Sequence, residues 1–155
     1  MKKKIQKLLK PSIAILAMFV LINLMVVPAL AKEDNILFGF TILAHNENTF
    51  SVGRDRTTKN AETPWMVNLT QSDEDPGVKC QTTFWLSKKA KELPGADGYS
   101  RQSDKHTIKE GSGKHKYTDA YLSACNETVY LTAENNNDTA TSYTAIGYWD
   151  EEYTK

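Results

Sequence analysis

The chain has 155 residues, 40% of them hydrophobic, with 19 basic and 19 acidic side chains. The charges are segregated: residues 1–31 hold five lysines and no acid, so residues 32–155 carry 14 basic and 19 acidic groups, a net charge of −5. One domain of ordinary size fits this length. The acidic body argues against nucleic acid as the partner, because phosphate binding requires clustered Lys and Arg.

The N-terminus has the three parts of a secretory signal peptide. Residues 1–10 are basic, residues 13–27 are apolar apart from one asparagine, and Ala29 and Ala31 are the small residues that a signal peptidase accepts. We therefore expect residues 1–31 to be removed, leaving a secreted, extracellular protein of residues 32–155 with no membrane span. The alternative is an uncleaved anchor over residues 13–30, which is near the minimum length that crosses a bilayer.

The part after the leader favours strands. It contains 14 aromatic residues and 16 threonines but only 19 Leu, Ile, Val and Phe, so rings must supply much of the core. Apolar alternation punctuated by Gly, Pro and Asn turns predicts an all-β fold, a small antiparallel β-sandwich of about seven short strands in a single domain. The strands are expected at residues 37–42, 50–52, 65–69, 82–86, 106–109, 128–132 and 142–149, with turns at 75–77, 94–95, 111–113 and 135–138.

Two segments have helical features within this β pattern. Residues 117–124 place Tyr and Ala at i, i+3, i+4 and i+7, the spacing of one helix face, and residues 87–93 precede a proline. Both segments are too short to change the expected class.

The only cysteines, Cys80 and Cys125, both follow the leader. An even number in an exported protein allows one disulfide, and strand alternation points both thiols inward. Closing a loop of about 45 residues would stabilise the protein by roughly 4 kcal/mol. The alternative is two buried thiols that pack as small hydrophobes.

The sequence shows no established catalytic motif. Ser112 lies between two glycines, with Asp104, His106 and His115 nearby, but the segment is not the G-x-S-x-G elbow of serine hydrolases. Glycine on both sides of a serine is typical of a turn. Spacings that bind a transition metal, a dinucleotide or a phosphate are also absent, so we expect no catalytic residue, no metal and no cofactor.

Acidic clusters at residues 73–75, 134–138 and 150–152 are interpreted as solvated loops. The alternative is weak calcium binding, although none of the clusters has the spacing of an EF-hand.

Four aromatic residues are candidates for ligand binding: Trp65, Trp85, Tyr148 and Trp149. Tyr148 and Trp149 are adjacent on one strand, so their side chains face opposite sides and a two-layer sandwich cannot bury both. An exposed ring beside polar groups can stack on a sugar or enter an interface. The alternative is that these rings cover the edge of a thin core.

Five segments carry a resemblance to known proteins: residues 63–70, 82–86, 111–121, 133–137 and 147–151. Together they resemble a family of small exported proteins of Gram-positive bacteria classed as a domain of unknown function, which implies no catalytic residues. The lysine-rich leader is also similar to Gram-positive leaders. More loosely, the layout is similar to lactococcin-type bacteriocins, which act on cell-wall assembly, but the cysteines, the greater length and the negative charge depart from that pattern.

These features predict a secreted, non-enzymatic binding protein that acts outside the cell. Its most concrete form is a bacteriocin-like or envelope-associated protein whose partner is a cell-wall or envelope component of bacteria. The alternatives are a matrix or surface structural protein that self-associates, and a small secreted hydrolase that uses Ser112 and His115.

Overall fold

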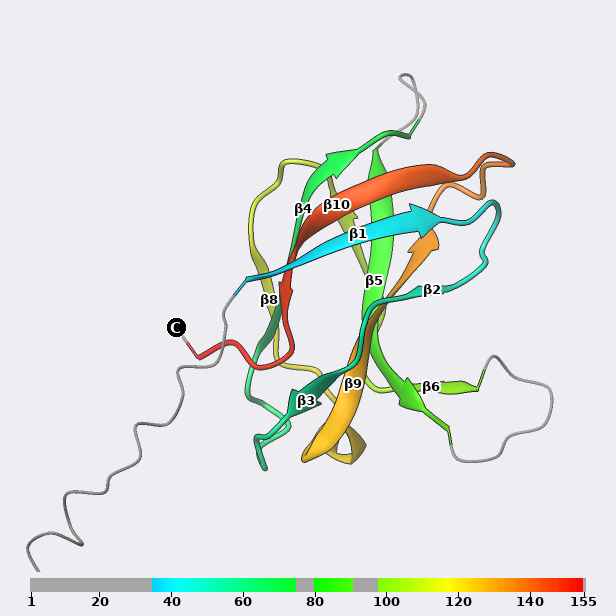
Figure 1. The fold of residues 1–155 in the computed structure, drawn as a ribbon. Coiled ribbons are helices and arrows are strands. Elements are labelled where there is room, and N and C mark those ends of the chain that lie inside the picture. The colour runs from blue at the N-terminus through cyan, green and yellow to red at the C-terminus, as the bar shows by residue number, and fades with distance from the viewer. Residues whose placement is uncertain (1–34, 75–79, 91–97, 155) are drawn as a thin grey trace, which may run out of the picture. The chain divides into compact units, whose positions relative to one another are not determined.

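The computed structural model describes residues 35–74, 80–90 and 98–154 (Figure 1). The predicted leader, with Ala29 and Ala31, lies outside these residues, as do the turns expected at 75–77 and 94–95. The described part contains ten strands and one 3-10 turn, and it has no helix long and apolar enough to cross a membrane. The strands are β1 (Ile36–Ile42), β2 (Thr49–Phe50), β3 (Arg54–Arg56), β4 (Trp65–Ser72), β5 (Gln81–Lys89), β6 (Tyr99–Arg101), β7 (His106–Lys109), β8 (His115–Tyr117), β9 (Glu127–Asn135) and β10 (Tyr143–Asp150).

The strands form two sheets in which every pairing is antiparallel. The first sheet has the order β1-β10-β4-β8. The second has the order β2-β9-β5-β6, with β3 also paired to β9 and β7 to β5. In Figure 1, β10 runs between β1 and β4, and β9 and β5 lie next to each other in the other layer. The predicted all-β, antiparallel class is confirmed.

The core lies between the two sheets and is rich in rings, as the composition predicts. Along β1, Phe38, Phe40 and Ile42 are buried and the residues between them are exposed, which is the two-residue period of a half-buried strand. The two sheets contribute large side chains to one cluster. Its rings are Phe38, Phe40, Trp65, Phe84, Tyr143 and Trp149.

All seven predicted strand positions contain a strand, but three further strands have no apolar alternation. β3, β6 and β8 read Arg-Asp-Arg, Tyr-Ser-Arg and His-Lys-Tyr. Each is held by pairing to a longer neighbour, β9, β5 or β4. Backbone hydrogen bonding therefore defines these strands where side-chain pattern does not.

The helical spacing at residues 117–124 does not produce an α-helix. Tyr117 ends β8, where it pairs with Trp65, and only Leu122–Ala124 form a 3-10 turn. Residues 87–89 are the end of β5, and residues 91–93 lie outside the described part. The turn expected at 111–113 is present, and Gly111 and Gly113 adopt positive φ values of 69° and 89°.

The structure corrects the predicted disulfide, because Cys80 and Cys125 are not joined. Cys80 precedes β5 and Cys125 precedes β9, and these two strands are antiparallel neighbours. The cysteines therefore lie at opposite ends of the nine-residue strand β9, roughly 25 Å apart along it at 3.3 Å per residue. A disulfide requires Cα atoms within about 7 Å.

Candidate functional site

The structure brings Ser112 and His115 together at the connection between β7 and β8. Ser112 Oγ lies 2.8 Å from His115 Nε2, and the same hydroxyl donates to Lys109 O at 2.6 Å. Because its single proton is directed to that carbonyl, Ser112 accepts from His115, whereas a nucleophile must donate to its general base.

Asp104, the carboxylate that the sequence places near Ser112, accepts from the Tyr121 hydroxyl at 3.3 Å, and the carboxylate that contacts His106 is Asp119, which the sequence did not single out. Asp119 Oδ2 lies 2.6 Å from His106 Nε2, and Asp119 Oδ1 accepts from the buried indole N–H of Trp65 at 2.9 Å. The His106 ring stacks on Tyr117 at 3.6 Å between centroids. Burial, and secondarily the charge of Asp119, raises the pKa of the Tyr117 phenol. Asp119 thus ties three strands, β4, β7 and β8, at one edge of the molecule.

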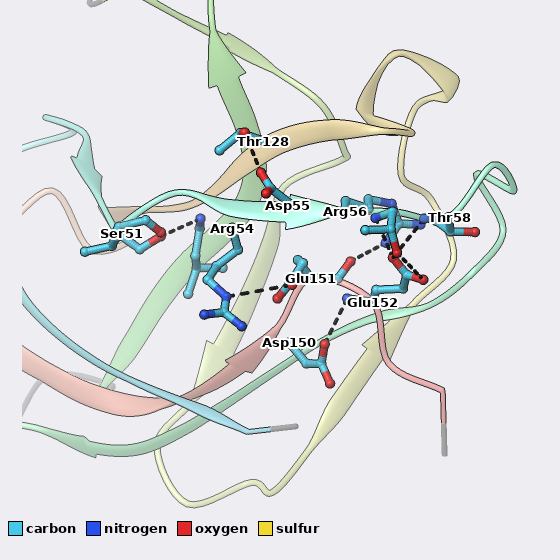
Figure 2. A network of polar contacts seen from close by, with 12 residues as sticks. Ser51, Arg54, Asp55, Arg56, Thr58, Thr128, Asp150, Glu151 and Glu152 are labelled. Atoms are coloured by element: carbon cyan, nitrogen blue, oxygen red, sulfur yellow. Dashed lines mark hydrogen bonds and ion pairs between the residues drawn. The ribbon is translucent and has the colours of Figure 1, made fainter. Parts of the chain in front are cut away.

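The acidic cluster 150–152 is not a solvated loop, which corrects its interpretation from the sequence. Asp150 and Glu151 are buried, and Figure 2 shows Glu151 facing Arg54 of β3, while Asp150 accepts from the backbone N–H of Glu152 at 2.9 Å. Arg54 Nε lies 3.8 Å from Glu151 Oε1, and the Glu152 carboxylate accepts the backbone N–H groups of Thr57 and Thr58 at 2.8 and 2.9 Å. These carboxylates fasten the C-terminal segment to the chain that follows β3.

The other acidic clusters also bind protein donors. Glu74 is buried and accepts from Gln81 N at 3.1 Å and from Asn137 Nδ2 at 2.7 Å. Glu134 pairs with Lys105 at 2.7 Å, and Asp138 with His45 at 3.3 Å.

Of the four predicted binding aromatics, Trp65, Trp85 and Trp149 are buried and Tyr148 is exposed. Trp65 and Trp149 have exposed fractions of 0% and 1%, so neither ring presents a face to a ligand. Tyr148 is 38% exposed on the outer side of the first sheet, as alternation with Trp149 requires. Trp85 has the opposite strand parity to the core residues Phe84 and Leu86, which places it on the outer side of the second sheet.

The outer side of the second sheet gathers further rings around Trp85. Phe50, Tyr99 and Tyr130 come from β2, β6 and β9, and the register places all three on this side. The Phe50 and Tyr99 rings stack at 3.9 Å between centroids, and Tyr99 meets Tyr130 edge to face at 5.1 Å.

Three cations accompany these rings. Lys105 Nζ lies 4.4 Å from the centre of the Trp85 ring, and Lys89 Nζ lies 5.8 Å from that of Tyr130. Arg101 on β6 pairs with Ser87 on β5, which places its side chain on the same side. We call this surface the cationic aromatic face. Its members are Phe50, Trp85, Lys89, Tyr99, Arg101, Lys105 and Tyr130.

The cationic aromatic face is hollowed. A recess of about 290 Å³ is lined by Asn48, Phe50, Trp85, Ser87, Tyr99, Arg101 and Lys105. Its volume is close to the lower end of the range for small-molecule sites, about 300–1,000 Å³. At its floor, Ser87 Oγ and Thr132 Oγ1 are hydrogen-bonded to each other and both residues are buried. The other lining groups are the rings, the cations of the rim and Asn48.

Of this face, the sequence indicated only Trp85. Tyr99 and Arg101 lie on a strand that has no apolar pattern, and Phe50 reads as one more core residue. A usable signal is present in β5, where the polar or aromatic positions 83, 85 and 87 alternate with Phe84 and Leu86. That alternation identifies Trp85 as a ring on the outer side, although not its neighbours from other strands.

Comparison with known proteins identifies a family but assigns no function. No curated protein matches the chain. One solved structure, titled "Crystal structure of PirA", is similar with a TM-score of 0.41 and 10% identity, over 78% of this chain and 99% of that one, a level that carries no functional inference. The family model described as "Protein of unknown function (DUF2712)" matches residues 25–153, so the predicted resemblance to an uncharacterised family is confirmed and the chain belongs to that family.

Proposed function

We propose that the protein is an exported, non-enzymatic binding protein that acts outside the cell on a component of the bacterial envelope, in a bacteriocin-like or wall-associated role. The observation that carries this proposal is the cationic aromatic face. Four rings and three cations from five separate segments converge on one side of the second sheet, around a recess.

Two physical considerations support binding as the role of this face. Phe50, Tyr99 and Tyr130 are partly exposed, and partly exposed rings beside cations suit ligands that present both an apolar surface and polar or charged groups. Such rings also cost solubility when they have no partner, so a cluster of them on one side of an exported domain is typical of an interaction site. The leader expected at residues 1–31 would deliver the face to the outside of the cell.

The proposal is tested by retention of the purified protein on isolated cell wall from related bacteria, together with growth inhibition of those bacteria. We expect retention, and we expect Tyr99→Leu to weaken it. Tyr148→Leu is the matched control, because it removes an exposed tyrosine from the other sheet. If the unaltered protein is not retained on the cell wall and does not inhibit growth, the envelope role is refuted.

A second candidate, a self-associating matrix or surface protein, is favoured by the edge of the first sheet. β1 is the terminal strand of that sheet. Leu37 on β1 is 64% exposed, and Val52, between β2 and β3, is 84% exposed. They line an apolar groove of about 330 Å³ with Phe38 and Phe40. An open edge with apolar side chains can pair with a second copy of the chain.

Sedimentation at rising protein concentration separates the two candidates. Self-association that Leu37→Lys abolishes would establish the structural role, whereas a monomer at all concentrations leaves only the binding role.

A further inference from the structure

We infer that the recess in the cationic aromatic face binds an acidic glycan, with a sugar ring against Phe50 and Tyr99 and its anionic substituent on Arg101. This inference rests on the proposed function and specifies its ligand. The shared chemistry is a pyranose ring that carries a carboxylate or a phosphate.

The rings determine the shape of ligand that the recess can accept. Phe50 and Tyr99 are half-buried and stacked on each other, so together they form a fixed apolar wall rather than two mobile side chains. Trp85, 4% exposed, forms the neighbouring part of the lining beneath Lys105. The recess of about 290 Å³ suits one ring at a time, which fits a unit of an extended polymer better than a folded ligand.

Arg101 favours a ligand that carries a negative charge. Lys105 is already neutralised by Glu134 at 2.7 Å, and that contact holds it over Trp85. Arg101 is exposed at the rim of the recess, and its guanidinium has no hydrogen bond or ion pair within the described parts of the chain. A guanidinium binds a carboxylate or a phosphate through two parallel hydrogen bonds, which makes it the group on this rim best suited to an anion.

The charge balance argues for a sugar polymer rather than a nucleic acid, although both offer flat rings and anions. Binding a single-stranded nucleic acid uses a groove of cations that follows successive phosphates. The face has three cations, one of them neutralised, on a body with a net charge of −5. It therefore provides for an isolated anion next to a ring, which is the spacing of a charged sugar.

The test measures binding of the purified protein to a set of defined polymers. Polygalacturonate carries rings with carboxylates, and dextran phosphate carries rings with phosphates. Dextran supplies rings without charge, polyglutamate supplies charge without rings, and a single-stranded oligonucleotide supplies both in another arrangement. We expect one or both charged glycans to bind at least about tenfold more tightly than the other three.

Matched variants connect that binding to the recess. Arg101→Ala and Tyr99→Leu are each expected to weaken binding of the charged glycan about tenfold, because each removes one of the two recognition elements. Lys59→Ala removes one exposed cation from the loop after β3 and is expected to change binding less than twofold. Circular dichroism of each variant confirms that it is folded.

The outcomes separate this inference from the proposed function. Equal binding of polyglutamate, of dextran or of the oligonucleotide overturns the acidic-glycan assignment, and so does charged-glycan binding that Arg101→Ala leaves unchanged. Retention on cell wall without binding to either charged glycan overturns the inference and leaves the proposed function standing. Absence of binding to both wall and polymers overturns both.

Discussion

At the level of single residues, the most constrained side chain is Arg56. It is fully buried, and its guanidinium donates to the carbonyl oxygens of Glu151, Ala61 and Thr63, the last at 2.6 Å (Figure 2). Burial lowers the pKa of Arg56, while neighbouring Cys125 and Glu152 oppose that shift. Three carbonyls from two separate segments depend on one cation, so Arg56 joins the C-terminal segment to the β3–β4 connection.

Replacing Arg56 is therefore expected to be severely destabilising. Arg56→Ala leaves buried carbonyl groups without a donor and opens a cavity, so we expect a loss of about 3 kcal/mol or more in the free energy of unfolding. Urea denaturation followed by tryptophan fluorescence measures it. Arg101→Ala, at an exposed position, is the matched control and is expected to stay within about 0.5 kcal/mol. Equal unfolding midpoints for the two variants would contradict the role assigned to Arg56.

Tyr143 makes the stability of the protein sensitive to alkaline pH. Its phenol is buried, shares a hydrogen bond of 2.9 Å with Thr82 Oγ1 and donates to Gln81 O at 3.2 Å. Burial raises the pKa of Tyr143 to about 12. The unfolded value is about 10, so the folded state holds this proton more tightly. The stability it contributes is complete below about pH 10 and is lost as pH rises through 12.

We expect the free energy of unfolding to fall by up to roughly 3 kcal/mol between pH 10 and pH 12 on account of this group. Tyr143→Phe should be less stable than the unaltered protein at pH 8 and lose less stability over the alkaline range. Urea denaturation at several pH values gives the comparison. Parallel pH profiles for the two proteins would show that Tyr143 titrates normally.

The positions of the two cysteines predict their redox state. Because β9 separates Cys80 from Cys125, we expect two reactive thiols per chain when the unreduced protein is unfolded and titrated with a thiol reagent. A reducing agent should leave the unfolding midpoint unchanged. Finding no reactive thiol in a monomeric sample would refute the strand register described above.

At the level of elements, β10 is the strand on which the first sheet depends, since it pairs with both β1 and β4. Its register to β4 shifts between Ile146 and Gly147. A Cβ at Gly147 would lie 2.1 Å from Asn68 O and 2.6 Å from Phe38 Cζ, so only glycine allows the backbone of β4 to approach this closely.

A pair of glycine variants tests that approach. Gly147→Ala is expected to cost about 3 kcal/mol or more, or to prevent folding, because the clash is with backbone. Gly39→Ala on the adjacent strand β1 meets nothing within 4 Å and is expected to be neutral or slightly stabilising. Thermal unfolding of both variants gives the measurement. Similar midpoints would mean that β10 and β4 do not lie as described.

The elements that the sequence predicts well are the longer strands, which are rich in apolar and aromatic residues. β1 shows a strict alternation, and β4, β5, β9 and β10 follow the predicted positions. β3, β6 and β8 are polar and exist through pairing to distant strands, which local pattern does not encode. The prediction of a disulfide was wrong for the same reason. Alternation predicts the side of the sheet to which a thiol points but not the end of the sheet at which it lies.

At the level of the whole molecule, the two outer surfaces differ in kind. The first sheet presents Tyr148 beside its cross-strand partner Leu37, together with an open apolar edge at β1. The second presents the cationic aromatic face, assembled from β2, β5, β6, β9 and the residues before β7. The sequence could indicate a binding protein through its aromatic content. The site itself could not be predicted, because its rings are up to 80 positions apart in the chain and converge only through the strand order.

Nuclear magnetic resonance can show whether the cationic aromatic face is the surface that binds. The measurement follows backbone amides and the three tryptophan indole N–H signals during titration with soluble envelope polysaccharide. We expect shifts at the Trp85 indole and at amides of β2, β5 and β6, with the Trp65 and Trp149 indoles unchanged. Shifts centred on β1 and β10, with the Trp85 indole unmoved, would contradict this expectation.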